Sequence, residues 1–246
     1  MRLFGLIGYP LTHSYSKKHF TEKFKKEGLD DCAFKNFEIP ELSELEGILK
    51  DHPELVGLSV TIPHKEDVLP YLFFADEIVK QTGACNCIKI KEGRLYGYNT
   101  DAFGFEKSLV KNLKPEHKKA MILGRGGAAK AVSYVLTRMN IPHKFVERHP
   151  NAKNSIAYYK LTEALMAEYL LIINCTPLGM FPNDDTYPPL LYNSITPSHY
   201  LFDLTYNPPK TLFLQQGEAR GATIQNGYEM LELQAEKSWR IWNELV

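Results

Sequence analysis

The stretch at residues 59–65, Ser-Val-Thr-Ile-Pro-His-Lys, contains side chains that could take part in acid–base chemistry. It overlaps an aliphatic, β-branched run at residues 55–60, which predicts a buried strand. Pro63 prevents simple continuation of that strand, so Thr61 and Lys65 are expected just past its carboxyl end, where open α/β sheets bind ligands. Taken alone, Lys65 is more simply explained as a solvated surface lysine.

Two serines form a second candidate group, in the loop after an expected strand at residues 3–7. Ser14 and Ser16 stand where a helix is expected to begin, with Ser16 as its N-cap. Because a helix N-terminus offers unpaired N–H groups to an anion, the two hydroxyls could hold a carboxylate there. The simpler alternative is that both serines only cap the helix.

A glycine-rich turn, GRGGAAKA at residues 124–131, lies between an expected strand at residues 120–123 and an expected helix at residues 131–139. Glycines at such a turn let the backbone approach a pyrophosphate, which the helix N-terminus then stabilises. The next expected strand is at residues 143–147. It ends in charged residues about twenty positions after the glycine turn, as is typical of dinucleotide-binding folds. The backbone ligands of the cofactor are expected at Gly124, Arg125, Gly126, Gly127 and Ala128.

The end of that strand carries conflicting signals for the choice of cofactor. An acid such as Glu147 typically accepts the ribose 2′-hydroxyl of NAD, whereas an arginine accommodates the 2′-phosphate of NADP. Arg148 and Arg125 are the candidates for that phosphate, with His149 and Lys153 as further ones. A carboxylate beside a phosphate would be repelled unless it turned away or paired with an arginine. We expect NADP, with NAD as the possible alternative.

The hydrophobic patterns along the chain predict an α/β fold. Further strands are expected at residues 33–39, 88–91, 94–98, 169–174, 201–204 and 222–225, and further helices at residues 42–50, 76–79, 102–112, 161–168, 211–220 and 227–244. Alternating strands and helices predict parallel sheets, while the turn residues Glu92-Gly93 between residues 88–91 and 94–98 predict a hairpin. We expect an N-terminal α/β substrate domain at residues 1–101, a Rossmann-like doubly wound dinucleotide-binding domain at residues 102–225, and a C-terminal helix at residues 226–246 that returns to the first domain.

Composition limits the partners. The 246 residues include 29 lysines plus arginines and 29 aspartates plus glutamates, so no basic excess indicates a nucleic acid or an anionic membrane. No apolar run reaches the roughly 20 residues needed to span a bilayer. Neither the four cysteines nor the eight histidines have metal-ligand spacing, so no metal is expected. We expect a cytoplasmic monomer or homodimer that binds a small-molecule substrate.

Taken together, the motifs resemble the shikimate dehydrogenase family over nearly the whole chain. The matching residues are Gly8, Pro10, His13, Ser14 and Ser16, then SVTIPHK, Gly-Ala-x-Asn at residues 83–86, YNTD at residues 98–101, LGxGGAAKA, INCTPLGM, DLTYNP, and finally Asn226, Gly227, Met230, Leu231 and Gln234. The resemblance implies reversible, NADPH-dependent reduction of 3-dehydroshikimate to shikimate in aromatic amino acid biosynthesis.

The resemblance also implies roles for single residues. By position it suggests Ser14, Ser16 and Tyr206 for the substrate carboxylate, Thr61, Lys65, Asn86, Asp101 and Gln234 for the ring hydroxyls and the reacting oxygen, and Thr176 and Gly227 for the cofactor. Arg125 and Glu147 depart from the family, which has a small residue and an asparagine there. These departures bear on the choice of cofactor.

Hydride transfer to a ketone leaves an alkoxide that must gain a proton, and Lys65 is the expected donor. Asp101 also fits the N-cap of the helix expected after it. If its carboxylate lay about 4 Å from the Lys65 amine, the attraction would be roughly 4 kcal/mol at an effective dielectric near 20. Two alternatives stay open: a quinate/shikimate dehydrogenase that prefers NAD, suggested by Glu147, and a non-catalytic sensor that binds shikimate.

Overall fold

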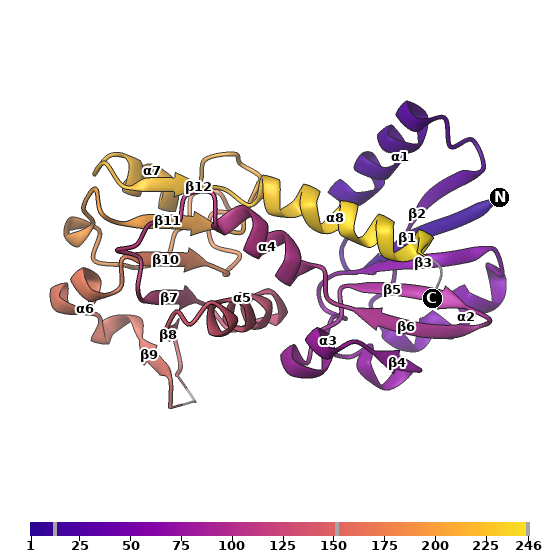
Figure 1. Cartoon of the computed structure of the whole chain (residues 1–246), viewed down its shortest axis with the longest axis horizontal. Helices are drawn as coiled ribbons and strands as arrows, with labels where there is room; N and C mark the ends of the chain where they lie inside the picture. Colours follow the sequence, from indigo (N-terminus) through magenta and orange to yellow (C-terminus); the bar gives the residue numbers. More distant parts are fainter. Residues whose placement is uncertain (12–13, 151–152, 245–246) are drawn as a thin grey trace. The chain divides into compact units, whose positions relative to one another are not determined.

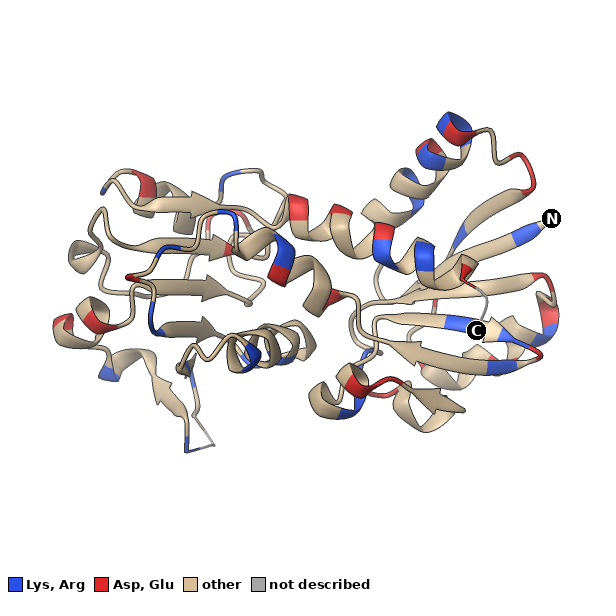
Figure 2. Cartoon of the chain, in the orientation of Figure 1, with Lys and Arg blue, Asp and Glu red and all other residues tan. Residues whose placement is uncertain are grey.

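The computed structural model describes residues 1–11, 14–150 and 153–244, and these form two compact units, each built on a six-stranded sheet (Figure 1). The first unit comprises Met1–Thr100 and the chain from Ala235 onward, and the second comprises Asp101–Gln234. Side chains of both charge signs occur in each unit (Figure 2). Within the described residues, no helix is long and apolar enough to cross a membrane.

The sheet of the first unit is mixed, with strand order β2-β1-β3-β5-β6-β4. Its elements are β1 (Arg2–Gly8), α1 (Tyr15–Glu27), β2 (Cys32–Glu38), α2 (Leu45–Asp51), β3 (Leu55–Val60), β4 (Phe74–Ala75), α3 (Glu77–Thr82), β5 (Cys87–Lys91) and β6 (Arg94–Tyr98). Strands β2, β1 and β3 form the expected parallel ladder, and β5 and β6 form the expected antiparallel hairpin. Strand β5 also runs antiparallel to β3, and the short β4 pairs in parallel with β6. The tight turn between β5 and β6 explains why these two strands are antiparallel, since Glu92 and Gly93 both have positive φ, as a type I′ hairpin turn requires.

Successive side chains of β1 point to opposite faces of the sheet, and both faces are buried. Phe4 and Leu6 pack on one face, with Phe20 of α1 and Trp242 from the end of the chain, while Leu3 contributes to the core on the opposite face. Phe20 and Phe24 are four residues apart and therefore lie on the same side of α1, which explains why this helix covers the sheet.

The second sheet is entirely parallel, with strand order β12-β11-β10-β7-β8-β9. Its unit contains α4 (Asp101–Leu109), β7 (Ala120–Leu123), α5 (Gly127–Arg138), β8 (His143–Glu147), β9 (Ser155–Ala157), α6 (Glu163–Glu168), β10 (Leu171–Asn174), β11 (Tyr200–Asp203), α7 (Leu212–Glu218) and β12 (Thr223–Gln225). Counted from β7, this is the 3-2-1-4-5-6 order of dinucleotide-binding folds, so the expected doubly wound sheet is confirmed.

The last helix, α8 (Tyr228–Asn243), contributes to both units, since the division of the chain falls between Gln234 and Ala235. Its C-terminal part is fixed within the first unit by Trp242, whose indole N–H donates to the carbonyl of Ile88 at 3.0 Å. Lys89 donates to the carbonyl of Ile241 at 3.1 Å. Cationic donors of this kind stabilise the last turn of a helix.

Candidate functional site

The loop after β3, which carries Thr61 and Lys65, is bound to the end of β1. The backbone N–H of Thr61 donates to the carbonyl of Ile7 at 3.0 Å, and that of Tyr9 donates to the carbonyl of Ile62 at 3.0 Å. A Cβ atom on Gly8 would come 2.4 Å from Cγ2 of Thr61, so the close approach of the two loops needs glycine at this position. Thr61 is thereby held beside the carboxyl end of β1.

His64 anchors the same loop, a role that sequence reasoning missed. Its side chain is buried, and Nε2 donates to the carbonyl of Ile39 at 2.7 Å. On the other side, the backbone N–H of Cys85 donates to the carbonyl of Lys65 at 2.8 Å. The backbone on which the half-buried Lys65 stands is therefore fixed, as a catalytic group needs.

Asn86 connects three segments of the first unit. Its Oδ1 accepts a hydrogen bond from the backbone N–H of Thr100 at 2.6 Å, and its Nδ2 donates to the Thr100 hydroxyl at 3.0 Å. The Thr100 hydroxyl also lies 3.0 Å from Oγ of Ser238 in α8. This network gives Asn86 a structural function, while its predicted contact with substrate stays a prediction. The sequence did not predict that Thr100 and Ser238 belong to this network, because only the tertiary fold brings them to Asn86.

The two serines differ from the expected arrangement. Ser14, not Ser16, is the N-cap of α1, so the predicted N-cap is wrong, and Ser16 lies within the first turn. Ser14 makes no side-chain capping bond, and its buried Oγ has no hydrogen-bond partner among the described residues. A buried hydroxyl without a protein partner is a suitable ligand for a bound anion. His13 of the same motif lies outside the described residues.

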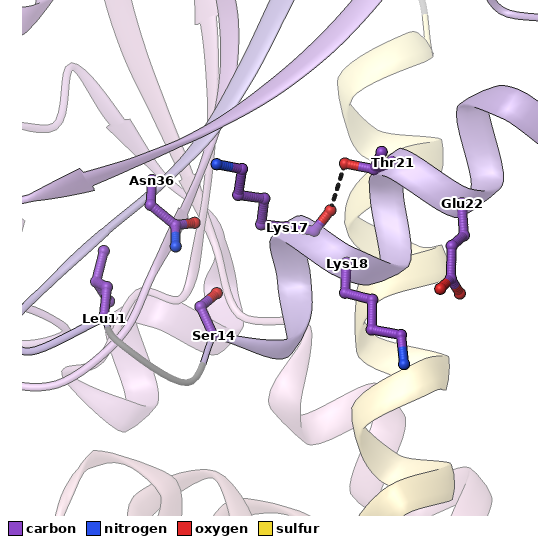
Figure 3. Close-up of a pocket in the computed structure, with 7 residues that line it drawn as sticks. All are labelled: Leu11, Ser14, Lys17, Lys18, Thr21, Glu22 and Asn36. Atoms are coloured by element: carbon purple, nitrogen blue, oxygen red, sulfur yellow. Dashed lines mark hydrogen bonds between the residues drawn. The ribbon is translucent and has the colours of Figure 1, made fainter.

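Ser14 also borders a hollow of about 510 Å³ on the first unit (Figure 3). The residues that line it are Leu11, Ser14, Lys17, Lys18, Thr21, Glu22 and Asn36. The side chain of Lys17 points toward Asn36, whereas those of Lys18 and Glu22 point away from it (Figure 3). Ser14 is the only one of the predicted substrate ligands among these lining residues, so this hollow is not the site that the sequence predicts.

In the second unit, the glycine turn has the geometry needed to bind a pyrophosphate. Gly124 has φ +89°, which favours glycine, and a Cβ atom there would come 2.9 Å from Cγ2 of Thr176. Gly126 is the N-cap of α5, and nothing lies within 4 Å of where its Cβ would be. The first turn of α5, which begins at Gly127, has no acidic residue. The N-terminus of this helix therefore fits an anion, as the expected cofactor requires.

A buried carboxylate, Asp203, supports the loops after β10 and β11. It accepts hydrogen bonds from Asn174 Nδ2 and from the Thr205 N–H, both at 3.0 Å, and from the Thr211 hydroxyl at 2.6 Å. Asn174 in turn accepts from the Thr176 hydroxyl at 2.6 Å. Sequence reasoning gave Asp203 no role of its own, although the network fixes Thr176 and the residue that precedes Tyr206.

Burial raises the pKa of Asp203 to about 6, from an ordinary value of 3.8. The folded protein therefore binds a proton on the Asp203 carboxyl group more tightly than the unfolded chain does. The resulting contribution to the free energy of unfolding is fully present below pH 3.8 and is lost as the pH rises through about 6. Compared with Asp203→Asn, the wild type should lose about 2 kcal/mol of unfolding free energy between about pH 4 and pH 7. Urea denaturation of both proteins across this range measures the difference, and a constant difference would contradict the assignment.

Asp101 and Gln234 stand on two helices of the second unit that approach closely. Asp101 is buried and is the first residue of α4 itself, rather than the residue before it. A Cβ atom on Gly104 of α4 would come 2.5 Å from the carbonyl oxygen of Met230 in α8 and 3.1 Å from Cβ of Gln234. The side-chain amide of Gln234 donates through Nε2 to the carbonyl of Leu231 at 3.0 Å. Gly104 thus allows the contact between these two helices.

The remaining predicted residues of the second unit lie at the ends of its strands and at the start of α8. Tyr206, in the loop after β11, is half-buried, and burial raises its pKa. The backbone N–H of Gly227 donates to the carbonyl of Thr205 at 3.0 Å. Arg148 follows β8 and is exposed, whereas Glu147 pairs with Arg125, the arrangement that would remove the conflict between its carboxylate and a phosphate.

Comparison with known proteins covers both units. Residues 6–88 match the model of the shikimate dehydrogenase substrate binding domain. The shikimate dehydrogenase (NADP(+)) of Methanosphaera stadtmanae is 34% identical over 97% of this chain and 90% of its own length. Among solved structures, a chorismate mutase/shikimate 5-dehydrogenase fusion protein from Clostridium acetobutylicum is 33% identical, with a TM-score of 0.88 over 99% of this chain and 91% of the other.

A further solved structure includes ligands. Shikimate 5-dehydrogenase from Thermus thermophilus, in complex with NADP(H) and shikimate, is 29% identical, with a TM-score of 0.83 over 100% of this chain and 95% of the other. The similarity in sequence and in fold thus extends through the substrate-side motifs and the glycine turn alike. This chain belongs to the shikimate dehydrogenase family.

Proposed function

We propose that this protein is an NADP-dependent shikimate dehydrogenase, which interconverts 3-dehydroshikimate and shikimate in aromatic amino acid biosynthesis. The observation that carries the proposal is the 34% identity to a shikimate dehydrogenase (NADP(+)) over 97% of the chain. The open N-terminus of α5 beside Gly126 and the parallel sheet behind it support the cofactor assignment. When bound, the nicotinamide supplies or accepts the hydride.

The substrate is an anion with several hydroxyl groups, and we assign its contacts accordingly. The hydroxyls of Ser14 and Ser16 and the phenol of Tyr206 hold the carboxylate, and the buried Oγ of Ser14 supports this assignment. The polar side chains that hold the ring hydroxyls are Thr61, Asn86 and Gln234. Such contacts orient the ring so that the reacting carbon presents one face to the nicotinamide.

Proton transfer is assigned to Lys65. In the reduction, its ammonium group donates a proton to the oxygen that becomes a hydroxyl, and in the reverse direction the amine takes the proton back. We assign Asp101 as its partner, which holds the ammonium group and a neighbouring substrate hydroxyl. The fixed backbone on both sides of Lys65 supports this assignment, because a proton donor must be positioned within hydrogen-bond reach.

The cofactor contacts are assigned to the glycine turn and the strand ends of the second unit. They are the backbone of Gly124, Arg125, Gly126, Gly127 and Ala128 for the pyrophosphate, Arg148 for the 2′-phosphate, and Thr176 and Gly227 for the rest of the dinucleotide, with Glu147 at the end of β8. The relative from Methanosphaera stadtmanae, a shikimate dehydrogenase (NADP(+)), supports NADP over the NAD alternative.

A cofactor comparison tests the proposal. Purified protein should reduce NADP when shikimate is added, with a kcat/KM at least about tenfold above that for NAD. Arg148→Ala should lose this preference by about ten- to one-hundredfold, because a charge-assisted contact to the 2′-phosphate is lost. Arg138→Ala, at the opposite end of α5 from the glycine turn, is the control and should behave like the wild type. Faster turnover with quinate and NAD would instead support the quinate dehydrogenase alternative.

We also propose that the protein works in the cytoplasm. Its four cysteines are all free thiols, as expected in a reducing compartment. We further predict a monomer or a homodimer, and light scattering of the purified protein distinguishes the two.

A further inference from the structure

Arg125 makes three contacts at the edge of the parallel sheet in the second unit. Its Nη1 lies 3.2 Å from Oε1 of Glu147 and donates to Oγ of Ser155 at 3.0 Å. Its guanidinium carbon lies 4.7 Å from the centre of the Phe145 ring, within cation–π range. An ion pair, a hydroxyl and an aromatic face thus fix one arginine that stands in the glycine turn itself.

The pairing of β8 with β9 explains how these contacts arise. In their parallel register Phe145 lies opposite Ser155, so the ring and the hydroxyl are neighbours across the two strands. Glu147 ends β8, and its side chain is 13% exposed, against 34% for Arg125. The carboxylate is therefore largely shielded from water, and Arg125 is the cation that compensates its charge.

The position of this ion pair matters for the choice of cofactor. In dinucleotide-binding folds, an acid at the end of the second strand accepts the ribose 2′-hydroxyl and disfavours a 2′-phosphate. Glu147 occupies this place, at the end of β8. An uncompensated carboxylate there would repel the phosphate group that distinguishes NADP from NAD.

We propose that Arg125 is a specificity-determining residue: by pairing with Glu147, it cancels the carboxylate's repulsion and so allows this site to accept a 2′-phosphate. Ser155 and Phe145 act as positioning residues that hold the guanidinium in place. The inference rests on the proposed function, since it concerns the cofactor of that reaction. It assigns the preference for NADP to a coupled pair of residues rather than to Arg148 alone.

Nucleotide binding tests the pair without relying on catalysis. Calorimetry would measure the dissociation constants of adenosine 2′,5′-bisphosphate and of ADP for the wild type, Arg125→Ala, Glu147→Gln and the double variant. Arg125→Ala should weaken bisphosphate binding by about tenfold or more, while ADP binding changes less than about threefold. The double variant should recover most of the lost affinity, because the carboxylate that Arg125 compensates is also gone.

Arg138→Ala is the matched control, because Arg138 likewise lies near an acid, Glu106 at 3.8 Å, and over an aromatic ring, Tyr134. It should bind both nucleotides like the wild type. If Arg125→Ala bound the bisphosphate normally, or if the double variant stayed as weak as Arg125→Ala, the inference would be overturned. The second outcome would make Arg125 a direct phosphate ligand. A wild type that preferred ADP would refute the NADP assignment as well.

Discussion

Replacing Lys65 with alanine should lower the turnover number by about 10² to 10⁴ when shikimate and NADP are saturating, because the reaction loses its positioned proton donor and acceptor. The Michaelis constants should change much less, since carboxylate and hydroxyl contacts to the substrate are retained. The backbone at this position is fixed by the carbonyl of Lys65 itself, which accepts from Cys85, and by the buried His64. The substitution therefore removes the amine without releasing the loop. Steady-state kinetics in both reaction directions measures the effect.

Lys80→Ala provides the matched control. Lys80 is an exposed lysine of α3 in the same unit, and its amine lies 5.9 Å from the centre of the Phe74 ring. Its loss should leave the turnover number within about twofold of the wild type, as is usual for surface substitutions. If Lys65→Ala lowered the turnover number by less than about tenfold, the role of Lys65 in proton transfer would be wrong.

The second large effect is expected on stability, from Gly227→Ala. A Cβ atom at Gly227 would come 2.0 Å from the carbonyl oxygen and 2.5 Å from the carbonyl carbon of Leu204. Both are backbone atoms of the residue that follows β11, so neither can move aside as a flexible side chain would. We expect a loss of about 3 kcal/mol, at the upper end of overpacking costs. The melting temperature should then fall by about 6–12 °C.

Gly47→Ala is the control for this experiment. Gly47 lies within α2, and nothing is within 4 Å of where its Cβ would be. Alanine is the better helix former, so this variant should be as stable as the wild type or up to about 1 kcal/mol more stable. Calorimetric melting of the three proteins compares them directly. A Gly227→Ala protein that melted within about 2 °C of the wild type would show that the start of α8 can move away from β11 at little cost.

Hydrophobic patterns in the sequence predicted most strands to within two residues of their observed bounds. The strand expected at residues 55–60 is β3 (Leu55–Val60), and the strand expected at residues 143–147 is β8 (His143–Glu147). The first is a mostly aliphatic run, whereas the second has an apolar centre at Phe145 and Val146, and both lie next to turn residues, as strands commonly do. The parallel sheet of the second unit followed from the alternation of such strands with helices.

Two strands were missed because they are too short to show a pattern. Strand β4 has only two residues, Phe74–Ala75, and β9 has three, Ser155–Ala157. Their positions depend on pairing with β6 and β8, which is a tertiary property. The omission of β9 mattered, because it carries Ser155 and hence one of the contacts that hold Arg125.

The candidate site was predicted unevenly for a similar reason. Motif residues such as Lys65 and Thr61 could be named in advance, since they follow a recognisable strand. Side chains that support the predicted residues carry no local signal, because their partners are distant in the sequence. His64, next to Lys65, bonds Ile39, and Ser238 bonds Thr100 in the network of Asn86. The N-cap of α1 was wrong by two residues, because a serine stands at both positions and capping preference cannot choose between them.

Isotope transfer gives the most direct test of the proposed reaction. Shikimate that carries deuterium on the carbon to be oxidised would be incubated with the protein and NADP, and the reduced cofactor analysed by mass spectrometry. The proposed reaction predicts that the reduced cofactor carries the deuterium and that 3-dehydroshikimate forms in equal amount. Binding of shikimate without any reduced cofactor would contradict the assignment as an enzyme and would identify the protein as a non-catalytic binder of shikimate.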